Sequence, residues 1–502
     1  MMKSVGSILL GSAAGLALVA SAHSADLPTT KAPAPPPTLS CFASFYDYIS
    51  ASAQDCPLTY MGITVYGQID VGAGYNSHAS GLNGAWPQGV QEAISKTSLG
   101  PKFQLVPGGL SESNVGVKGK EEFAPGWSFV FDVNTGFDPY SLQLANGPKS
   151  LVENNDRPVT LQSSNGDSSR AGQWDNTRGY LGISNSTFGA LTVGRQYSLT
   201  NDAVNNYDPM GASYAFSLIG NSSTLVSGVG DTEVARYNTS LKYQIAYNNF
   251  RAAADWQFGG YSQGNGSDGA YQFDVGADYA GFSVDAIYSY AKDAVTLSTY
   301  AAGSTLPKGW TPDDLKATLA DISGAVLAAK YTNGPFKLFG GYENALFTPP
   351  SDAYPAGFGT LGDYTVLPGA VSTTTYINHK ELQVAWFGAK YAIRPDLDIT
   401  GAYYWTGQNN YSNYAGLSAA KIAAFCAPNT AKLAGTTIVG QGSANSTCAG
   451  TEDAVSALLD WRPLSRLDVY GGVMFSQVAG GLANGFIHTT SIAPTAGLRL
   501  TF

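Results

Sequence analysis

From residue 63 to the end of the chain, apolar and polar residues alternate with a period of two. Between Tyr271 and Tyr279, every odd position is apolar and every even position is polar or small. Successive side chains of a β-strand point to opposite faces, so this pattern predicts strands with one apolar and one polar face. The segment 282–290 repeats the pattern, and the intervening Ala280-Gly281 predicts a tight hairpin turn.

Sixteen segments with this alternation follow one another along the chain. Their connections alternate between tight turns, such as Ala124-Pro125-Gly126 and Asn333-Gly334, and long stretches, such as 137–177, 197–235 and 408–451. An even strand number with short turns at one end and long loops at the other is the layout of an outer-membrane barrel. The predicted strands span residues 62–75, 112–122, 126–136, 178–185, 188–196, 236–246, 249–258, 271–280, 281–291, 323–332, 335–344, 378–393, 397–407, 452–462, 466–478 and 491–502.

The membrane explains why such strands must form a closed structure. Hydrocarbon offers no hydrogen-bonding partners, so a β-structure within it must pair every backbone group and close on itself. The apolar face then contacts lipid, and the polar face lines a lumen. We therefore predict an all-β fold, a 16-stranded antiparallel transmembrane β-barrel with short periplasmic turns and long extracellular loops. Apolar residues are too few to fill so wide an interior, so we expect the lumen to hold water.

Composition argues against several alternatives to a membrane barrel. Only 13% of the residues are charged, compared with about 25% in soluble globular proteins. The mean hydropathy of -0.06 argues against several membrane-spanning helices, which need about 20 apolar residues each. A soluble propeller or sandwich would alternate similarly, but the low charge and the aromatic residues near strand ends favour a membrane barrel. A net charge of -10 argues against a nucleic-acid partner.

The first 24 residues have the features of a secretory signal peptide. A basic residue precedes an apolar stretch, and the small residues Ala22 and Ser24 favour cleavage before Ala25. A retained helical anchor is the alternative, but the apolar stretch is short and interrupted by Gly and Ser. We assign residues 25–61 to a Pro-rich leader with the Cys41/Cys56 segment, and residues 62–502 to the barrel.

The four cysteines fall into two local pairs, Cys41 with Cys56 and Cys426 with Cys448. Each pair lies in a segment without strand alternation. A secreted chain meets an oxidising compartment, so we expect two disulfides that close local loops. Four cysteines allow three connectivities, and this pairing rests on proximity alone.

Several motifs make the chain resemble the trimeric general porins of Gram-negative bacteria. Two early strands carry Thr64-Val65-Tyr66-Gly67 and Gly116-Val117-Lys118-Gly119, and 188–196 reads Phe-Gly-Ala-Leu-Thr-Val-Gly-Arg-Gln before a long loop. The chain also ends in Phe502, as members of that family do. Asp26-Leu27-Pro28 and the Pro-rich leader look more like the porins of rhizobia and other alphaproteobacteria. The stretch between the first two cysteines has no counterpart in the general family pattern.

This resemblance implies a homotrimer in the Gram-negative outer membrane, in contact with its lipid and lipopolysaccharide. It implies insertion by the barrel-assembly machinery through the C-terminal Phe502. The implied function is passive diffusion of small hydrophilic solutes and ions, without enzymatic activity or a cofactor. The loop near 197–235 would fold into the lumen as a constriction.

Selectivity in such a channel depends on its width and on the charges that line it. Alternation places Lys118, Arg236 and Lys242 on the inward face, because a charge facing lipid near the midplane would cost roughly 2–4 kcal/mol. With Arg178 and Arg195, these cations would form a basic wall opposite acids of the constriction loop. Strict alternation groups Arg195 with lipid-facing neighbours, so a place in the lumen, which the resemblance favours, requires a bulge or a rim position. The loop acids are Asp202, Asp208, Asp231 and Glu233.

Other interpretations of these features remain open. The loop acids Asp202 and Asp208 could merely cap turns, because Asp208-Pro209 is a common turn start. A substrate-selective channel, for example for sugars, would carry aromatics along the lumen, and Tyr66 and Tyr404 are inward candidates. A barrel enzyme such as a lipase or protease would need a histidine near Ser or Asp at the rim, and His379 lies at a strand start. The histidines after the signal, at 78, 379 and 488, are scattered, so we expect no metal site.

Overall fold

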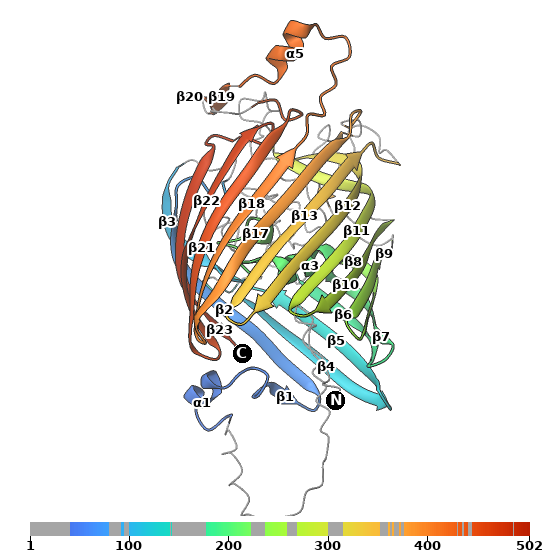
Figure 1. The fold of residues 1–502 in the computed structure, drawn as a ribbon, viewed down its shortest axis with the longest axis vertical. Helices are drawn as coiled ribbons and strands as arrows, with labels where there is room; N and C mark the ends of the chain where they lie inside the picture. Colours follow the sequence, from blue (N-terminus) through green and yellow to red (C-terminus); the bar gives the residue numbers. More distant parts are fainter. Residues whose placement is uncertain are drawn as a thin grey trace, which may run out of the picture.

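The computed structural model forms a closed antiparallel barrel with short turns at one end and long loops at the other (Figure 1). The first long strand, β2 (Ile63–Asn76), pairs with the last, β23 (Thr490–Thr501), from Gln68↔Thr501 to Gly74↔Thr495. This pairing closes the ring and confirms the predicted fold class. The structure describes residues 41–79, 92–94, 100–140, 142, 177–221, 236–258, 269–299, 315–351, 360–361, 364–365, 371–372, 376–428, 430–433, 436–439, 444–484 and 486–502.

Within these residues, 16 long strands build the barrel, as the alternation predicts. Consecutive strands pair in antiparallel order around the ring. Between β2 and β23 they are β4 (Asn114–Ala124), β5 (Trp127–Gly136), β6 (Arg178–Asn185), β7 (Gly189–Tyr197), β8 (Arg236–Tyr247), β9 (Phe250–Gln257), β10 (Ala270–Tyr279), β11 (Phe282–Thr299), β12 (Leu315–Asn333), β13 (Phe336–Thr348), β17 (Lys380–Arg394), β18 (Leu397–Gln408), β21 (Gly450–Leu464) and β22 (Leu467–Gly480).

Shorter elements lie at the two ends of the barrel and inside it. Among the helices that the structure describes, none is long and apolar enough to cross a membrane. The helices are α1 (Phe45–Ser50), α3 (Leu199–Tyr207), α4 (Leu218–Asn221) and α5 (Ala419–Phe425). The short strands are β1 (Leu58–Tyr60), β3 (Lys102–Pro107), β14 (Thr360–Leu361), β15 (Tyr364–Thr365), β16 (Val371–Ser372), β19 (Thr430–Leu433) and β20 (Thr436–Val439).

Two strands extend beyond their predicted ends. The strand β11 continues to Thr299 and β12 begins at Leu315, although alternation predicts an end at 291 and a start at 323. A register shift between Ala291 and Ala294 marks the point where the pattern is interrupted. The added residues lie at the long-loop end. Strands that leave the hydrocarbon layer no longer need an apolar outer face, so their pattern fades while their pairing continues.

The two faces of the wall differ in polarity. On β9, Phe250 and Trp256 are exposed on the outer face, whereas the inward Asp255 is buried. Part of the interior, however, departs from the expected polar lumen. Trp386 and Met474 are among the inward side chains of β11, β12, β17, β18, β21 and β22 that form an apolar cluster with residues of the loop that follows β7. That cluster exists because the loop packs against this part of the wall.

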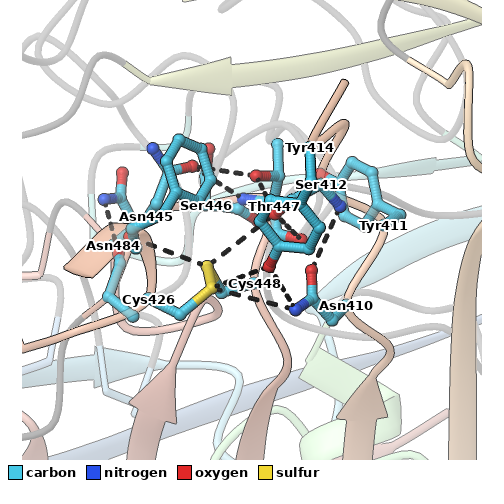
Figure 2. Close-up of a disulfide and its surroundings, with 12 residues drawn as sticks. Asn410, Tyr411, Ser412, Tyr414, Cys426, Asn445, Ser446, Thr447, Cys448 and Asn484 are labelled. Atoms are coloured by element: carbon cyan, nitrogen blue, oxygen red, sulfur yellow. Dashed lines mark hydrogen bonds between the residues drawn. A yellow bond between two sulfur atoms is a disulfide. The ribbon is translucent and has the colours of Figure 1, made fainter. Parts of the chain in front are cut away.

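Both predicted disulfides, Cys41–Cys56 and Cys426–Cys448, are present. Figure 2 shows the second, which closes the long loop between β18 and β21. At the base of this loop, the Tyr411 N–H donates to the Thr447 carbonyl at 3.0 Å. The hydroxyls of Ser412 and Thr447 lie 2.8 Å apart. The bridge therefore joins two arms of the loop that already pair with each other.

A buried aspartate organises a break in the wall. Strands β3 and β4 pair with successive parts of β2, and residues 108–113 between them leave the ladder. The Oδ2 atom of Asp70 accepts the N–H groups of Leu110 and Ser111 at 2.8 and 2.9 Å. Its Oδ1 atom accepts the Tyr470 hydroxyl at 2.6 Å. The carboxylate thus satisfies backbone donors that the ladder leaves unpaired.

Replacing Asp70 with alanine should destabilise the folded barrel. The change leaves two backbone N–H groups and the Tyr470 hydroxyl without this acceptor, and each such loss costs about 1–3 kcal/mol. We expect a lower unfolding temperature, measured by circular dichroism in detergent. Asp47→Ala in α1, at an exposed position, is the matched control. Equal unfolding temperatures for the two variants would contradict this role of Asp70.

Candidate pore constriction

After β7, the chain turns into the lumen and forms the helix α3. The hydroxyl of Ser198 caps the helix by accepting the Asn201 N–H at 3.2 Å. The side chain of Gln272, from β10, accepts the N–H groups of Leu199 and Thr200 at 2.5 and 3.2 Å. Free N–H groups at a helix start need such acceptors, so a wall residue fixes where the loop enters the lumen.

The C-terminal end of α3 is anchored through Tyr207. Its hydroxyl accepts a hydrogen bond from Arg251 Nη2 at 2.6 Å, and its carbonyl accepts the indole N–H of Trp386 at 3.0 Å. Arg251 is itself held by ion pairs to Asp278 and Asp285 on neighbouring strands. The helix is therefore attached to the wall at both ends.

Beyond α3, apolar side chains hold the loop against the opposite part of the wall. Val204 of α3, and Met210 and Phe216 beyond it, are buried in the cluster with inward residues of β11 to β22. Phe216 meets the Tyr470 ring edge-on at 6.2 Å, and the Ala215 N–H donates to the Gly109 carbonyl at 3.0 Å. The loop therefore follows the inside of the wall from β8 to β22, and its apolar contacts lie on β11 to β22.

The remaining sector, β2 to β8, carries the predicted basic wall of Lys118, Arg178, Arg236 and Lys242. Arg178 Nε lies 2.9 Å from Asp132 Oδ2, and Arg178 Nη2 donates to the Tyr66 hydroxyl at 3.1 Å. Lys118 Nζ lies 4.7 Å from the centre of the Tyr66 ring. This part of the wall combines cations with aromatic rings, which attract cations through their faces.

Tyr197 links the basic wall to the start of the loop. The guanidinium carbons of Arg178 and Arg236 lie 5.0 and 4.9 Å from its ring centre. Its carbonyl accepts a hydrogen bond from Lys242 Nζ at 2.9 Å. Lys242 also pairs with Asp202, in the first turn of α3. The structure thus brings one predicted loop acid into contact with one predicted wall cation.

Asp208 lies elsewhere than expected. Only 2% of its surface is exposed, and its carboxylate accepts the Tyr404 hydroxyl at 2.5 Å and the Ala212 N–H at 2.6 Å. Burial raises the pKa of this carboxyl. Asp208 ends α3, and its carboxylate caps the following turn. This is the turn-capping role that the sequence leaves open as an alternative. Asp208 therefore points to β18 and away from the basic wall.

Three predicted site residues remain, namely Arg195, Asp231 and Glu233. At Arg195, the ladder between β7 and β8 shifts register between Gly194 and Gln196, which is the bulge that alternation requires. Its Nε and Nη2 atoms are shielded from solvent. Asp231 and Glu233 lie outside the described residues.

Sequence reasoning left several site residues out of the predicted set. Alternation places Asp132 on the inward face, but its pairing was not predicted. It lies directly opposite Lys118 across the β4–β5 hairpin, and counting back from the Pro125-Gly126 turn would have found that pair. Tyr197 also follows Arg195 closely enough to have been included. Gln272 and Trp386 had no such signal, because they become relevant only where the loop contacts distant strands.

The barrel fold is similar to that of solved structures. An anion-selective porin from Comamonas acidovorans matches with a TM-score of 0.52 and 14% sequence identity, over 88% of this chain and 99% of that one. OmpT, an outer membrane protein of Vibrio cholerae, matches with a TM-score of 0.48 and 13% identity, over 89% and 99% of the two chains. At such identities, the first likeness supports the fold alone.

Sequence comparison identifies relatives as well. An outer membrane porin protein of Bordetella pertussis is 23% identical over 307 residues, which are 60% of this chain and 60% of that protein. The aligned part thus spans less than two thirds of the curated relative. The family model described as Gram-negative porin matches residues 12–421. Together with the closed barrel, the family and the relative place this chain in the cell outer membrane. Because the family match covers most of the sequence, the chain belongs to the Gram-negative porin family.

Proposed function

We propose that this protein forms a water-filled channel for passive diffusion of small hydrophilic solutes and ions. One observation carries this proposal. The constriction loop packs its apolar side against β11 to β22, while the inward face of β2 to β8 presents charged side chains. Charged groups beside an aqueous path favour hydrated ions and polar solutes, and they set selectivity without a catalytic centre.

The alternatives have less support from the site. Tyr404, one of two aromatics considered for a sugar path, is fully buried beneath the loop. Tyr66, the other, contacts Asp132 and Arg178. For a barrel enzyme, the candidate His379 is exposed and accepts a hydrogen bond through its backbone carbonyl from Asn409. We therefore propose a general channel and not an enzyme.

The assembly and processing of the chain extend this proposal. We infer a homotrimer in contact with outer-membrane lipid and lipopolysaccharide, assembled by the barrel-assembly machinery through Phe502. The backbone of Phe502 pairs with that of Gly67 and so lies at the closing seam. We further propose a signal peptide at 1–24, a leader at 25–61 and a barrel at 62–502. The start Asp26-Leu27-Pro28 supports a place among the alphaproteobacterial porins.

A trimer should be visible on gels. An unheated detergent sample should migrate near three chains and a boiled sample near one, because a closed ladder resists unfolding by detergent. Analytical ultracentrifugation provides an independent mass. A monomer in both measurements would contradict the trimer but leave the barrel intact.

Removing a cation from the wall and removing an acid from the loop should shift ion selectivity in opposite directions. Lys118→Gln removes a cation from the inner wall, so it should shift the reversal potential toward cation permeation. Asp202→Asn releases Lys242 from its ion pair and should shift the potential toward anions. Both shifts should shrink at high salt, since the Debye length falls from about 10 Å at 0.1 M to 3 Å at 1 M.

Planar-bilayer recording in a salt gradient measures these shifts. Lys421→Gln in the external helix α5 and Asp453→Asn on the outer face of β21 are controls of the same charge change. Unchanged potentials in Lys118→Gln and Asp202→Asn would mean that other residues determine selectivity.

The loop anchor at Asp208 should control channel closure. Tyr404→Phe removes the hydroxyl that donates to the buried Asp208, a loss worth about 1–3 kcal/mol. We expect more frequent closing events in single-channel recordings, at nearly the same open conductance. Tyr403→Phe is the matched control, because Tyr403 is the preceding residue on β18, faces outward and bonds to Asp453. Equal closing rates in the two variants would show that this bond does not hold the loop.

A further inference from the structure

Aromatic side chains border the short-turn end of the barrel on its outer face. Such rings are typical of the membrane–water interface, where an amphipathic ring meets the headgroup layer. We call this border the aromatic girdle. Exposed members at six successive turns are Phe123, Phe188, Phe250, Phe282, Phe336 and Tyr391.

The girdle is interrupted at the seam where β22, β23 and β2 meet. In this described part of the chain, the outward positions nearest the short-turn end are Leu467, Leu500 and Ile63. Phe502 follows β23, but its ring packs over Gly67, where a Cβ atom would lie 2.7 Å from the ring. Gly67 lies on the outer row of β2 with Val65 and Ile69, so this ring is on the outer face but is only partly exposed.

The N-terminal segment, residues 41–60, is docked at that interruption. Figure 1 shows α1 and β1 beside the C-terminus at the short-turn end. Arg466, in the β21–β22 turn, is only 2% exposed and donates to the carbonyls of Tyr48, Ala51 and Ser52 at 3.0, 3.0 and 3.2 Å. Its guanidinium lies 4.1 Å from the centre of the Tyr48 ring. The Arg466 side chain thus makes several of the contacts that attach the segment to the barrel, beside a hydrogen bond from the Ser465 hydroxyl to the Ser50 carbonyl at 2.7 Å.

The docked segment leaves its own aromatic side chains uncovered. Phe42, Phe45 and Tyr46 are 65%, 68% and 66% exposed. Strand β1 pairs with the start of β2, and Tyr60, which is 79% exposed, lies opposite Ile63. The apolar row on the outer face of β2 therefore continues onto β1. Apolar groups gathered on one surface in this way mark a contact with a membrane or a partner.

We propose that the N-terminal segment completes the aromatic girdle at the seam and places Phe45, Tyr46 and Tyr60 in the headgroup layer of the periplasmic phospholipid leaflet. The continuity of these side chains with the lipid-facing row of β2 favours phospholipid as the occupant. Arg466 is the positioning residue. This role is independent of which solutes the channel passes, so it does not depend on the proposed transport function.

Fluorescence quenching by phospholipid tests the proposal. Full-length processed protein carrying Phe45→Trp is reconstituted in phosphatidylcholine vesicles, with or without acyl chains brominated near the headgroup. The signal of the parent protein, which contains 8 tryptophans, is subtracted. Phe282→Trp, within the girdle, is the positive reference. Phe425→Trp, in the external helix α5, is the negative reference.

We expect Phe45→Trp to be quenched to the same extent as Phe282→Trp, and Phe425→Trp to be unaffected. Adding Arg466→Gln should release the segment and remove most of the quenching at position 45. Quenching in Phe282→Trp with Arg466→Gln should persist, which shows that the barrel still folds.

Two results would overturn the proposal. The first is a Phe45→Trp signal that behaves like Phe425→Trp. The second is efficient photocrosslinking between chains from benzoylphenylalanine at position 45, together with absent lipid quenching, because a second copy of the chain would then be the occupant. Quenching at position 45 that is unchanged by Arg466→Gln would refute Arg466 as the positioning residue.

Discussion

Hydrocarbon cannot satisfy a backbone N–H or C=O group, and this constraint forces the ladder of this protein to close. The closing pair, β2 with β23, joins residues more than 400 positions apart in sequence. Several other features are concentrated near that seam. Asp70 on β2 satisfies donors at a break in the wall, Phe502 covers Gly67, and the N-terminal segment is attached through Arg466.

A closed ring of strands also encloses a lumen, and a loop of the chain occupies part of it. The constriction loop divides it by packing one apolar side on the wall, which stabilises the loop through burial as a core does in a soluble domain. The wall beneath the loop contributes apolar side chains to this cluster, beside the ion-paired Arg251 and Asp285, whereas the sector from β2 to β8 contributes mainly charged and aromatic side chains. We propose that the selectivity of the channel depends on where the loop is anchored as well as on which charges the chain carries.

Buried charges in this protein are held by several partners each. Arg178 contacts Asp132 and two tyrosines, Arg251 contacts two aspartates and the helix α3, and Arg466 contacts backbone carbonyls. A buried cation without such partners would carry a large desolvation cost. The planar guanidinium, with five N–H donors, suits these positions better than a lysine ammonium. Arginines therefore fix the elements that the strand ladder does not reach.

The sequence by itself predicted the barrel, its strand number and both disulfides, because alternation and the spacing of cysteines along the chain are local properties. It also predicted that Lys118, Arg236 and Lys242 face inward, since a side chain's face follows from its position in the strand. Which groups the loop residues contact was decided only by the tertiary structure. Asp208 could be assigned to Tyr404, and α3 to Gln272 and Trp386, only after the path of the loop across distant strands was known. Contacts between segments so far apart leave no periodic trace in the sequence, which is why the wall was predictable and the docking of the loop was not.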